Sequence, residues 1–232
     1  MSFYHGKLSR VYLNGYNLSS FFDSADMPMN SDTVETTCFN MDDKEYVMGN
    51  KTATISAEGF FDGSTQASEE ALLAAFYSTN NWSYYPYGDS SGNYGYAMSA
   101  QNNTYGIKGS VTGAVRVSAA GQSQVGKERV ISLKGLAEST LSTSASNIDN
   151  SAATTNGASA YLHITANASS DFYPYVEHSA SGTTWDTLVD FTTGTGGRTS
   201  ERVTVTGTVK QYVRATWTTT EAATFQIGFC RK

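Results

Sequence analysis

At 232 residues, with 39% hydrophobic, 12% aromatic and 16% charged side chains, the chain suits one or two domains and carries less charge than an average soluble protein. Its formal net charge of −6 argues against binding nucleic acid by phosphate neutralisation, which needs clustered lysine and arginine, but not against letting nucleic acid pass without adhering. Abundant threonine and valine and 15 tyrosines predict a mainly β fold, because branched and aromatic side chains suit a pleated, half-buried surface.

The N-terminal segment, the apolar runs and the cysteines indicate where the chain is made. The segment MSFYHGKLSR lacks the apolar centre of a signal peptide, and no apolar run approaches the roughly 20 residues of a membrane-spanning helix. Cys38 and Cys230 lie far apart in two apparent strands, so we expect them to be reduced and packed rather than part of a disulfide framework. We therefore expect synthesis in a cytoplasm and no membrane anchor.

Short strands and loops fill the first quarter of the chain. Strands are predicted at 7–13, 16–22, 33–39 and 52–61, and residues 23–31 are expected to form a loop. Asn14-Gly15 predicts a two-residue turn between the first two strands, because both central positions of a type I′ turn need a positive φ. In the last two strands apolar and polar side chains alternate, which is typical of half-buried antiparallel strands.

The predicted loop Asn40–Lys51 separates the last two of these strands. It holds a row of charged residues and then an apolar cluster: Asp42, Asp43, Lys44, Glu45, Tyr46, Val47 and Met48. Hairpins usually close with two to five residues, so a loop of about a dozen indicates a functional or mobile insert. A polar rim beside an apolar anchor is typical of a docking surface. The alternative that the spacing leaves open is a solvated loop with Tyr46 folded back on its own sheet.

A helix and four further strands complete the first half. The helix is predicted from Ser68, a suitable N-cap, to about Tyr77, with Leu72, Leu73 and Phe76 on its apolar face. Strands are predicted at 82–87 and 94–98, as a hairpin across the turn 88–93, and at 105–119 and 128–133. Glycines within 105–119 are expected to bend that strand or to mark bulges.

A change of composition divides the chain. Residues 137–157 are small and polar and hold a single leucine and a single isoleucine, so they are expected to be a linker or a surface strap. The predicted domains are residues 1–136 and 158–232. In the second domain, strands are predicted at 160–165, 172–178, 185–192, 201–206, 212–218 and 224–230. Short strands at this regular spacing indicate a small sandwich, immunoglobulin-like or jelly-roll-like.

No residue pattern points to catalysis. His5, His163 and His178 lack a carboxylate or cysteine at ligand spacing, and His163 is interpreted as a satisfied or exposed strand residue. No G-x-S-x-G, H-E-x-x-H, phosphate-loop or dinucleotide motif occurs. Adjacent carboxylates such as Asp42 and Asp43 seldom oppose each other across a substrate. We therefore expect no enzyme, no catalytic residue, no metal and no cofactor.

Two binding hypotheses remain. In the second half, Tyr173 and Tyr175, with Trp185 and Trp217, are candidates to stack on sugar rings, although alternation with polar neighbours favours the core for both tryptophans. The competing hypothesis is self-assembly. A mainly β chain with a long charged loop, a glycine-rich strand and little charge is suited to forming rings by pairing strand edges.

The order and spacing of several motifs point to a family. Asp43-Lys44-x-Tyr46-x-x-Gly49-x-Lys51 is followed by Ile55-Ser56-x-Glu58-Gly59-x-Phe61. The strand Gly-Lys-x-x-x-Val-Tyr-x-Asn-Gly precedes them, and the helix after Gly63 and the glycine-rich strand follow. With these motifs, residues from about 5 to 135 resemble the tail-tube proteins of long-tailed bacteriophages. Head-decoration and baseplate proteins of the phage virion share parts of the pattern.

The resemblance implies an assembly. A tail-tube-like β-sandwich or barrel with one flanking helix would join its copies into hexameric rings that stack into a tube. One set of residues would reach a neighbouring subunit or ring: Asp42, Asp43, Lys44, Glu45, Tyr46, Val47, Met48, Gly49 and Lys51. Ser56 and Glu58 would lie near the sheet that faces the channel. An acidic channel suits the passage of DNA, since like charge prevents adhesion.

The same resemblance implies a setting. The protein would be made in the host cytoplasm and reside in the virion tail, with copies of itself and other virion proteins as partners and DNA passing without specific binding. The second half is similar to sandwich modules displayed on phage particles, some of them suspected of sugar binding, in which Tyr173 and Tyr175 would be the contacts. Minimal tube proteins lack such a module. Its presence keeps open a head-decoration, baseplate or carbohydrate-binding role.

Overall fold

The computed structural model describes residues 5–168, 171–192 and 197–232 of the chain; residues 1–4 of the N-terminal segment discussed above lie outside these ranges. Most described residues lie in antiparallel strands, which confirms the predicted mainly β fold. A short 3-10 turn, η1 (Gly6–Leu8), and one helix, α1 (Ser68–Ala75), interrupt the strands in the described part of the chain. No described helix is long and apolar enough to cross a membrane.

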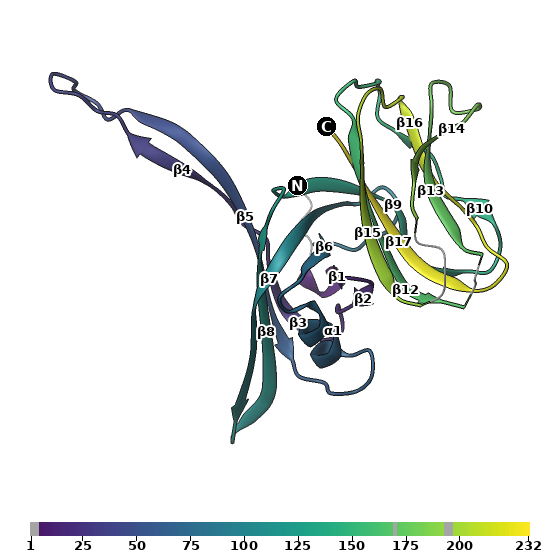
Figure 1. The fold of residues 1–232 in the computed structure, drawn as a ribbon, viewed down its shortest axis with the longest axis horizontal. Coiled ribbons are helices and arrows are strands. Elements are labelled where there is room, and N and C mark those ends of the chain that lie inside the picture. Colours follow the sequence, from purple (N-terminus) through teal and green to yellow (C-terminus); the bar gives the residue numbers. More distant parts are fainter. Residues whose placement is uncertain (1–4, 169–170, 193–196) are drawn as a thin grey trace.

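Strands before residue 140 form the first half of the molecule (Figure 1). They are β1 (Arg10–Leu13), β2 (Tyr16–Asn17), β3 (Phe22–Asp26), β4 (Met29–Glu35), β5 (Tyr46–Phe60), β6 (Thr79–Tyr85), β7 (Tyr94–Ser110), β8 (Gly113–Ser123) and β9 (Glu128–Ser139). The long strand β7 organises them. Its first part pairs with β6 on one edge and with β9 on the other, and its second part pairs with β8, which in turn pairs with β5.

The core of the first half lies between these strands and α1. Alternate residues of β5, including Ile55, point inward and pack with Trp82 of β6, Met98 of β7 and Leu72 of α1. The helix differs from its prediction in detail. Ser68, the predicted N-cap, is the first residue of the helix, and Ala67 is the N-cap. The helix ends at Ala75. Ser68, Ala71, Leu72 and Ala75 form its buried face at the spacing i, i+3, i+4, i+7, and Leu73 is exposed because it lies outside that stripe.

Strands after residue 140 form a second core. They are β10 (Thr143–Ser144), β11 (Ile148–Asp149), β12 (Ala158–Asn167), β13 (Tyr173–Ser179), β14 (Asp186–Asp190), β15 (Thr199–Val205), β16 (Tyr212–Thr218) and β17 (Ala223–Arg231). The six longer ones confirm the strands predicted there. A five-stranded sheet around β16 packs on the sheet made by β15, β12, β17 and β9, with Phe172, Trp217 and Phe225 in contact between them.

The two halves share one sheet. Strand β9 pairs along its second part with β17, so the path β15-β12-β17-β9-β7-β6-β1-β2 runs without interruption through both halves. Residues 137–139, predicted as the start of the linker, belong to β9, and the short strands β10 and β11 of the same segment pair with β16. The division into residues 1–136, 137–157 and 158–232 stays a prediction.

Buried polar contacts reinforce the junction between the halves. On the His163 ring, Nε2 lies 2.9 Å from Ser83 Oγ, and Nδ1 accepts from the Gly15 amide at 3.4 Å. Gln226 Nε2 donates to Tyr85 Oη at 2.6 Å. The turn Asn14-Gly15 has the predicted positive φ at both positions. A Cβ at Gly15 would lie 2.6 Å from the carbonyl oxygen of Ile164, so only glycine lets this turn approach the second half.

Three strand predictions were wrong. Residues 23–31 contain parts of β3 and β4 rather than a loop. The predicted strand 105–119 is two strands, β7 and β8, which turn at Val111 and Thr112. The predicted loop Asn40–Lys51 includes the start of β5 at Tyr46, and the loop itself is Thr36–Glu45. In each case the pairing of one strand with another decided the boundary, which the pattern of a single segment does not report.

Candidate functional site

A two-stranded ribbon projects from the body of the first half, and we call it the arm (Figure 1). It consists of β4, the loop Thr36–Glu45 and residues 46–53 of β5. Neither β4 nor this part of β5 pairs with any other described strand, so both edges of the arm are open. Isolated two-stranded hairpins are marginally stable in water. The arm therefore lacks the neighbouring strands that stabilise the rest of the sheet.

Both faces of the arm carry apolar side chains. Val34 lies opposite Val47, and the next pair along the ladder places Thr33 opposite Met48. Because successive residues of a strand point to opposite faces, Val47 and Met48 cover different faces. The side chains of Val34, Val47, Met48 and Tyr46 are 54–67% exposed. Apolar surface on both sides of one ribbon is typical of a segment enclosed by partners.

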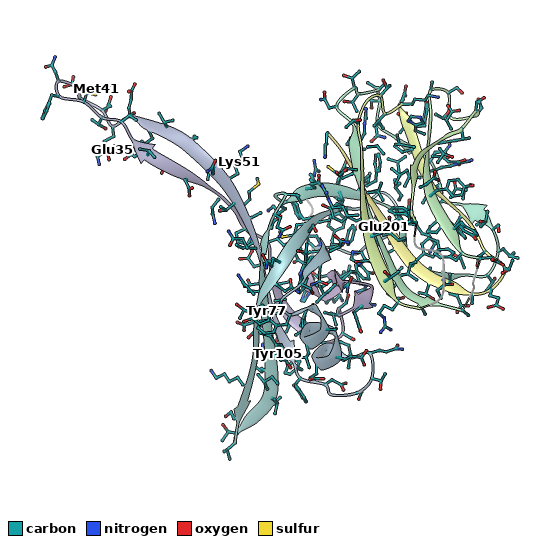
Figure 2. The ribbon with its side chains drawn as sticks, in the orientation of Figure 1. Glu35, Met41, Lys51, Tyr77, Tyr105 and Glu201 are labelled. Carbon is teal, nitrogen blue, oxygen red and sulfur yellow. The ribbon has the colours of Figure 1, made fainter. Side chains whose placement is uncertain are left out.

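The tip of the arm combines apolar and acidic groups. Phe39 is fully exposed, and Asp42 and Asp43 lie free of the body. Three contacts close the loop: the Thr36 amide donates to the Glu45 carbonyl at 2.9 Å, the Glu45 amide donates to Thr37 Oγ1 at 3.2 Å, and Lys44 Nζ lies 3.0 Å from Glu35 Oε2. Lys44 and Glu35 are both exposed, so their ion pair contributes little to stability. Figure 2 shows Glu35 and Met41 along the outer arm, with Lys51 nearer the body.

Cys38 also lies in this loop. It is exposed and free, so the expectation of a packed cysteine is wrong for Cys38, because no described strand covers the tip. Cys230 is free as well and half-buried in β17. Burial raises the pKa of its thiol to about 11.

A second projection is the hairpin formed by the outer parts of β7 and β8. Val111 at its turn is fully exposed, and Ile107 and Val115 are largely exposed. At its base Arg116 makes two hydrogen bonds to the Asp23 carboxylate, at 2.7 and 2.9 Å, and these hydrogen bonds lower the pKa of Asp23. The sequence signal for this hairpin is the pair Gly109 and Gly113 around the turn, which was interpreted as a bend within one strand.

One face of the sheet formed by β3, β5, β8 and β7 points away from α1 and is polar. Ser56 and Glu58 lie on it, opposite the core-facing positions of β5. Their neighbours across the ladder are small: Ala120 is opposite Ser56, and Ser118 is opposite Glu58. On the other side of β5 the partners of Ser56 and Glu58 are Asp26 and Ser24. Around Ser56 and Glu58 the face is thus formed by small and polar side chains and is acidic at Asp26 and Glu58, whereas the exposed Phe60 lies at the end of the same row under Arg116.

The candidate sugar contacts lie on the second half. Tyr173 and Tyr175 are two residues apart in β13 and point to one face of the five-stranded sheet. Tyr173 is exposed and Tyr175 is half-buried, and burial raises the pKa of Tyr175. Trp217 is buried as expected. The placement of Trp185 in the core is wrong, because its ring is half-exposed under the Arg214 guanidinium, 4.1 Å from the ring centre. A glycan contact at Tyr173 and Tyr175 stays a prediction.

The buried titratable groups have internal partners. His163 is enclosed at the junction, and desolvation lowers its pKa to about 3. Burial opposes the charge of Glu128, yet hydrogen bonds from Tyr161 and Arg202 hold the pKa of Glu128 below its usual value. Lys134 Nζ donates to the carbonyls of Ala137 and Phe225. Among residues 5–168, 171–192 and 197–232, no three His, Cys, Asp or Glu side chains gather as metal ligands.

No protein-family model matches the sequence, and no curated protein matches it. Several solved structures match the chain in part, with TM-scores below 0.5. A chain of the virion of a native gene transfer agent is 16% identical, covers 54% of this chain and 97% of its own length, and has a TM-score of 0.44. The Dit protein (gp 19.1) of phage SPP1, titled a hub adsorption apparatus, is 11% identical over 95% of this chain and 98% of its own, with a TM-score of 0.37. A chain of the phage p2 baseplate in its activated conformation is 8% identical over 97% and 98%, with a TM-score of 0.36.

Proposed function

We propose that this chain is a structural subunit of a phage tail that assembles with copies of itself into a ring, and that the rings stack into a tube that conducts DNA. The observation that carries the proposal is the arm, whose two faces expose apolar side chains and whose edges are unpaired. Such a ribbon is costly to leave in water, and a neighbouring subunit is the simplest cover for it. The proposed interface comprises the tip residues Asp42, Asp43, Lys44 and Glu45 and the strand residues 46–51.

The sheet of the first half provides two open edges for ring closure. On one side, β3 and β4 pair only with β5. On the other side, no described strand pairs with the outer edge of β7 beyond Asn102. Joining one edge to the opposite edge of the next copy is a head-to-tail contact, which closes into a ring when the rotation fits. Closure would also remove the open edges, which otherwise favour aggregation.

The polar face of this sheet is suited to line the channel. Ser56, Glu58, Ser118 and Ala120 lie side by side on it and offer small or polar side chains to a passing polymer, with Phe60 at the end of the strand as the large apolar side chain of this row. The charges on this face and at its margin are Asp23, Asp26, Glu58, Lys108 and Arg116, which sum to −1 per chain (three acidic and two basic groups). A wall with a slight excess of negative charge repels DNA phosphates and prevents adhesion. The proposed setting is the virion tail, as for the viral particles named above, with other virion proteins as partners and no enzymatic activity.

The shared sheet favours a second candidate, a ring of a baseplate. Through β9 and β17 the second half is continuous with the first and adds bulk to one side of every subunit. A ring that carries such a mass is suited to hold other proteins at the end of a tail as well as to repeat along a tube. The two candidates differ in whether rings stack on one another.

Electron microscopy and light scattering of the purified full-length chain test the proposal. We expect rings, with stacked rings and hollow tubes for the tube role and single rings for the baseplate role. The measurement covers a series of protein concentrations at moderate salt, since weak interfaces form only above their dissociation constant. Protein that stays monomeric at every concentration contradicts self-assembly and favours a head-decoration role.

A further inference from the structure

Tyr77, just after α1, combines a strained backbone with an exposed ring. Its φ is +61°, in the left-handed region where a bulky side chain costs roughly 1–2 kcal/mol. Its amide donates to the Asn102 carbonyl at 3.0 Å, a bond that any residue except proline would make there. The side chain is 81% exposed, so it adds little to the core. Glycine or asparagine would suit the backbone better, and the fold of a single chain gives no reason for a tyrosine.

Three neighbours extend this ring into a surface, which we call the aromatic patch: Leu73, Phe76, Tyr77 and Tyr105. The ring centres of Phe76 and Tyr77 lie 4.3 Å apart, and those of Phe76 and Tyr105 lie 6.4 Å apart. Leu73 of α1 is exposed. Figure 2 shows Tyr77 and Tyr105 near one another beside α1. Tyr105 Oη is shielded from water and has no hydrogen-bond partner, which is costly for a hydroxyl group.

The aromatic patch lies where the outer edge of β7 becomes open. The Asn102 amide donates to the Ser78 carbonyl at 3.0 Å, and beyond this bond no described strand continues on that edge. A strand from another molecule would take up the edge at this point. Tyr105 lies opposite Ala119, a core-facing residue of β8, so Tyr105 is on the α1 side of the sheet. A strand added to the edge would therefore place alternate side chains beside Tyr105.

The other open edge of the sheet offers a matching side chain. Met29 of β4 lies opposite Ala53, which faces the same core, so Met29 also points to the α1 side. Met29 is 51% exposed. If the two edges join head to tail, Met29 of one copy and the aromatic patch of the next lie on the same face of the combined sheet. A flexible thioether against aromatic rings is a favourable contact.

We propose that the aromatic patch is the anchor for a second copy of this chain, docking by the β3–β4 edge with Met29 over Tyr77 and Tyr105. The inference rests on the proposed function and names the partner of one of its ring edges. Burial of Tyr77 between two subunits supplies the reason for its strained backbone, because aromatic anchors dominate the energy of interfaces.

Tyr77→Gly in the full-length chain tests the proposal. The variant removes the ring and relieves the backbone, so we expect the Tm of the unassembled protein to be unchanged or higher. The protein concentration at which half of the chains are assembled is expected to rise by about tenfold or more, the usual effect of losing an aromatic hot spot. Tyr173→Ala, which truncates an exposed tyrosine on β13 of the second half, is the matched control and is expected to assemble as the wild type does.

Met29→Ser and the double variant identify the partner edge. If Met29 and Tyr77 meet across the interface, the double variant weakens assembly by less than the product of the two single effects. Assembly of Tyr77→Gly at the wild-type concentration overturns the proposal and leaves the proposed function intact. A Tm lowered by several degrees also overturns it, because Tyr77 would then act within one chain. Wild-type protein that never assembles contradicts the proposed function itself.

Discussion

At the scale of single residues, His163 shows how the junction between the halves depends on protonation. The ring is enclosed, stacks on Tyr12 with ring centres 5.6 Å apart, and meets Ser83 and the Gly15 amide through its two nitrogens. No carboxylate contacts it to offset a positive charge. Desolvation lowers its pKa to about 3, so His163 stays neutral in the folded protein.

This pKa predicts a loss of stability in mild acid. An unfolded histidine takes up a proton below about pH 6.5, whereas folded His163 does so only near pH 3. Between these two values, each fall of one pH unit therefore lowers the free energy of unfolding by up to about 1.4 kcal/mol. Stability from this residue is complete above pH 6.5 and declines as the pH falls. We expect wild-type protein to lose about 2 kcal/mol more than His163→Gln between pH 7 and 4.5 in urea unfolding. Equal losses in the two proteins would contradict a neutral, enclosed His163.

At the scale of elements, the arm contributes little to the folding of the single chain. Its apolar side chains are exposed, its one ion pair lies at the surface, and its edges are open. The core-facing residues of β5 begin at Ala53, where the arm joins the body. The arm is therefore a segment that the fold of the single chain does not use.

Replacing residues 34–47 by Asn-Gly, which closes a two-residue hairpin, separates folding from assembly. We expect a Tm within a few degrees of the wild type, because the removed residues bury little surface in one chain. Ring or tube assembly is expected to be lost or to require at least about a hundredfold higher concentration, since several apolar contacts go at once. Light scattering and calorimetry measure the two quantities. A variant that folds and assembles normally would show that the arm is dispensable.

At the scale of the whole molecule, the shared sheet and the buried contacts at the junction predict one cooperative unit. Strand β9 links the second core to the junction between the halves, since Leu133 packs in the second core while Val130 packs with Tyr12 and Tyr161 in a cluster between the halves. Loss of either half would leave β9 without half of its pairing.

Calorimetry of unassembled protein checks this cooperativity. The variant in which Asn-Gly replaces residues 34–47 is suited to the measurement, because it is expected to stay unassembled. We expect one transition with equal calorimetric and van't Hoff enthalpies. A fragment of residues 158–232 is expected to be unfolded, because β17 would expose the edge that β9 covers. Two separate transitions, or a stably folded fragment, would show that the halves are independent domains.

Local pattern alone was sufficient for several features. Alternation of apolar and polar residues located the six longer strands of the second half, and Asn14-Gly15 located a turn with two positive φ values. These succeed because a strand with one buried face has a period of two, and a tight turn restricts φ, whatever lies elsewhere in the chain. The length and charge of the predicted loop Asn40–Lys51 indicated a functional or mobile insert.

The ends of the strands and the exposure of their surfaces depend on contacts formed in the folded chain. Tyr46, Val47 and Met48 became strand because β4 lies beside them, and residues 105–119 became two strands because they pair with each other. The sharing of β9 between the halves, the open edge of β7 and the strained backbone of Tyr77 likewise depend on contacts between residues far apart in the chain. The mainly β character and the local turns are readable from the amino-acid sequence, since these follow from side-chain period and backbone φ. Pairing partners, and with them the arm and the open edges, were decided by the balance of burial across the whole fold.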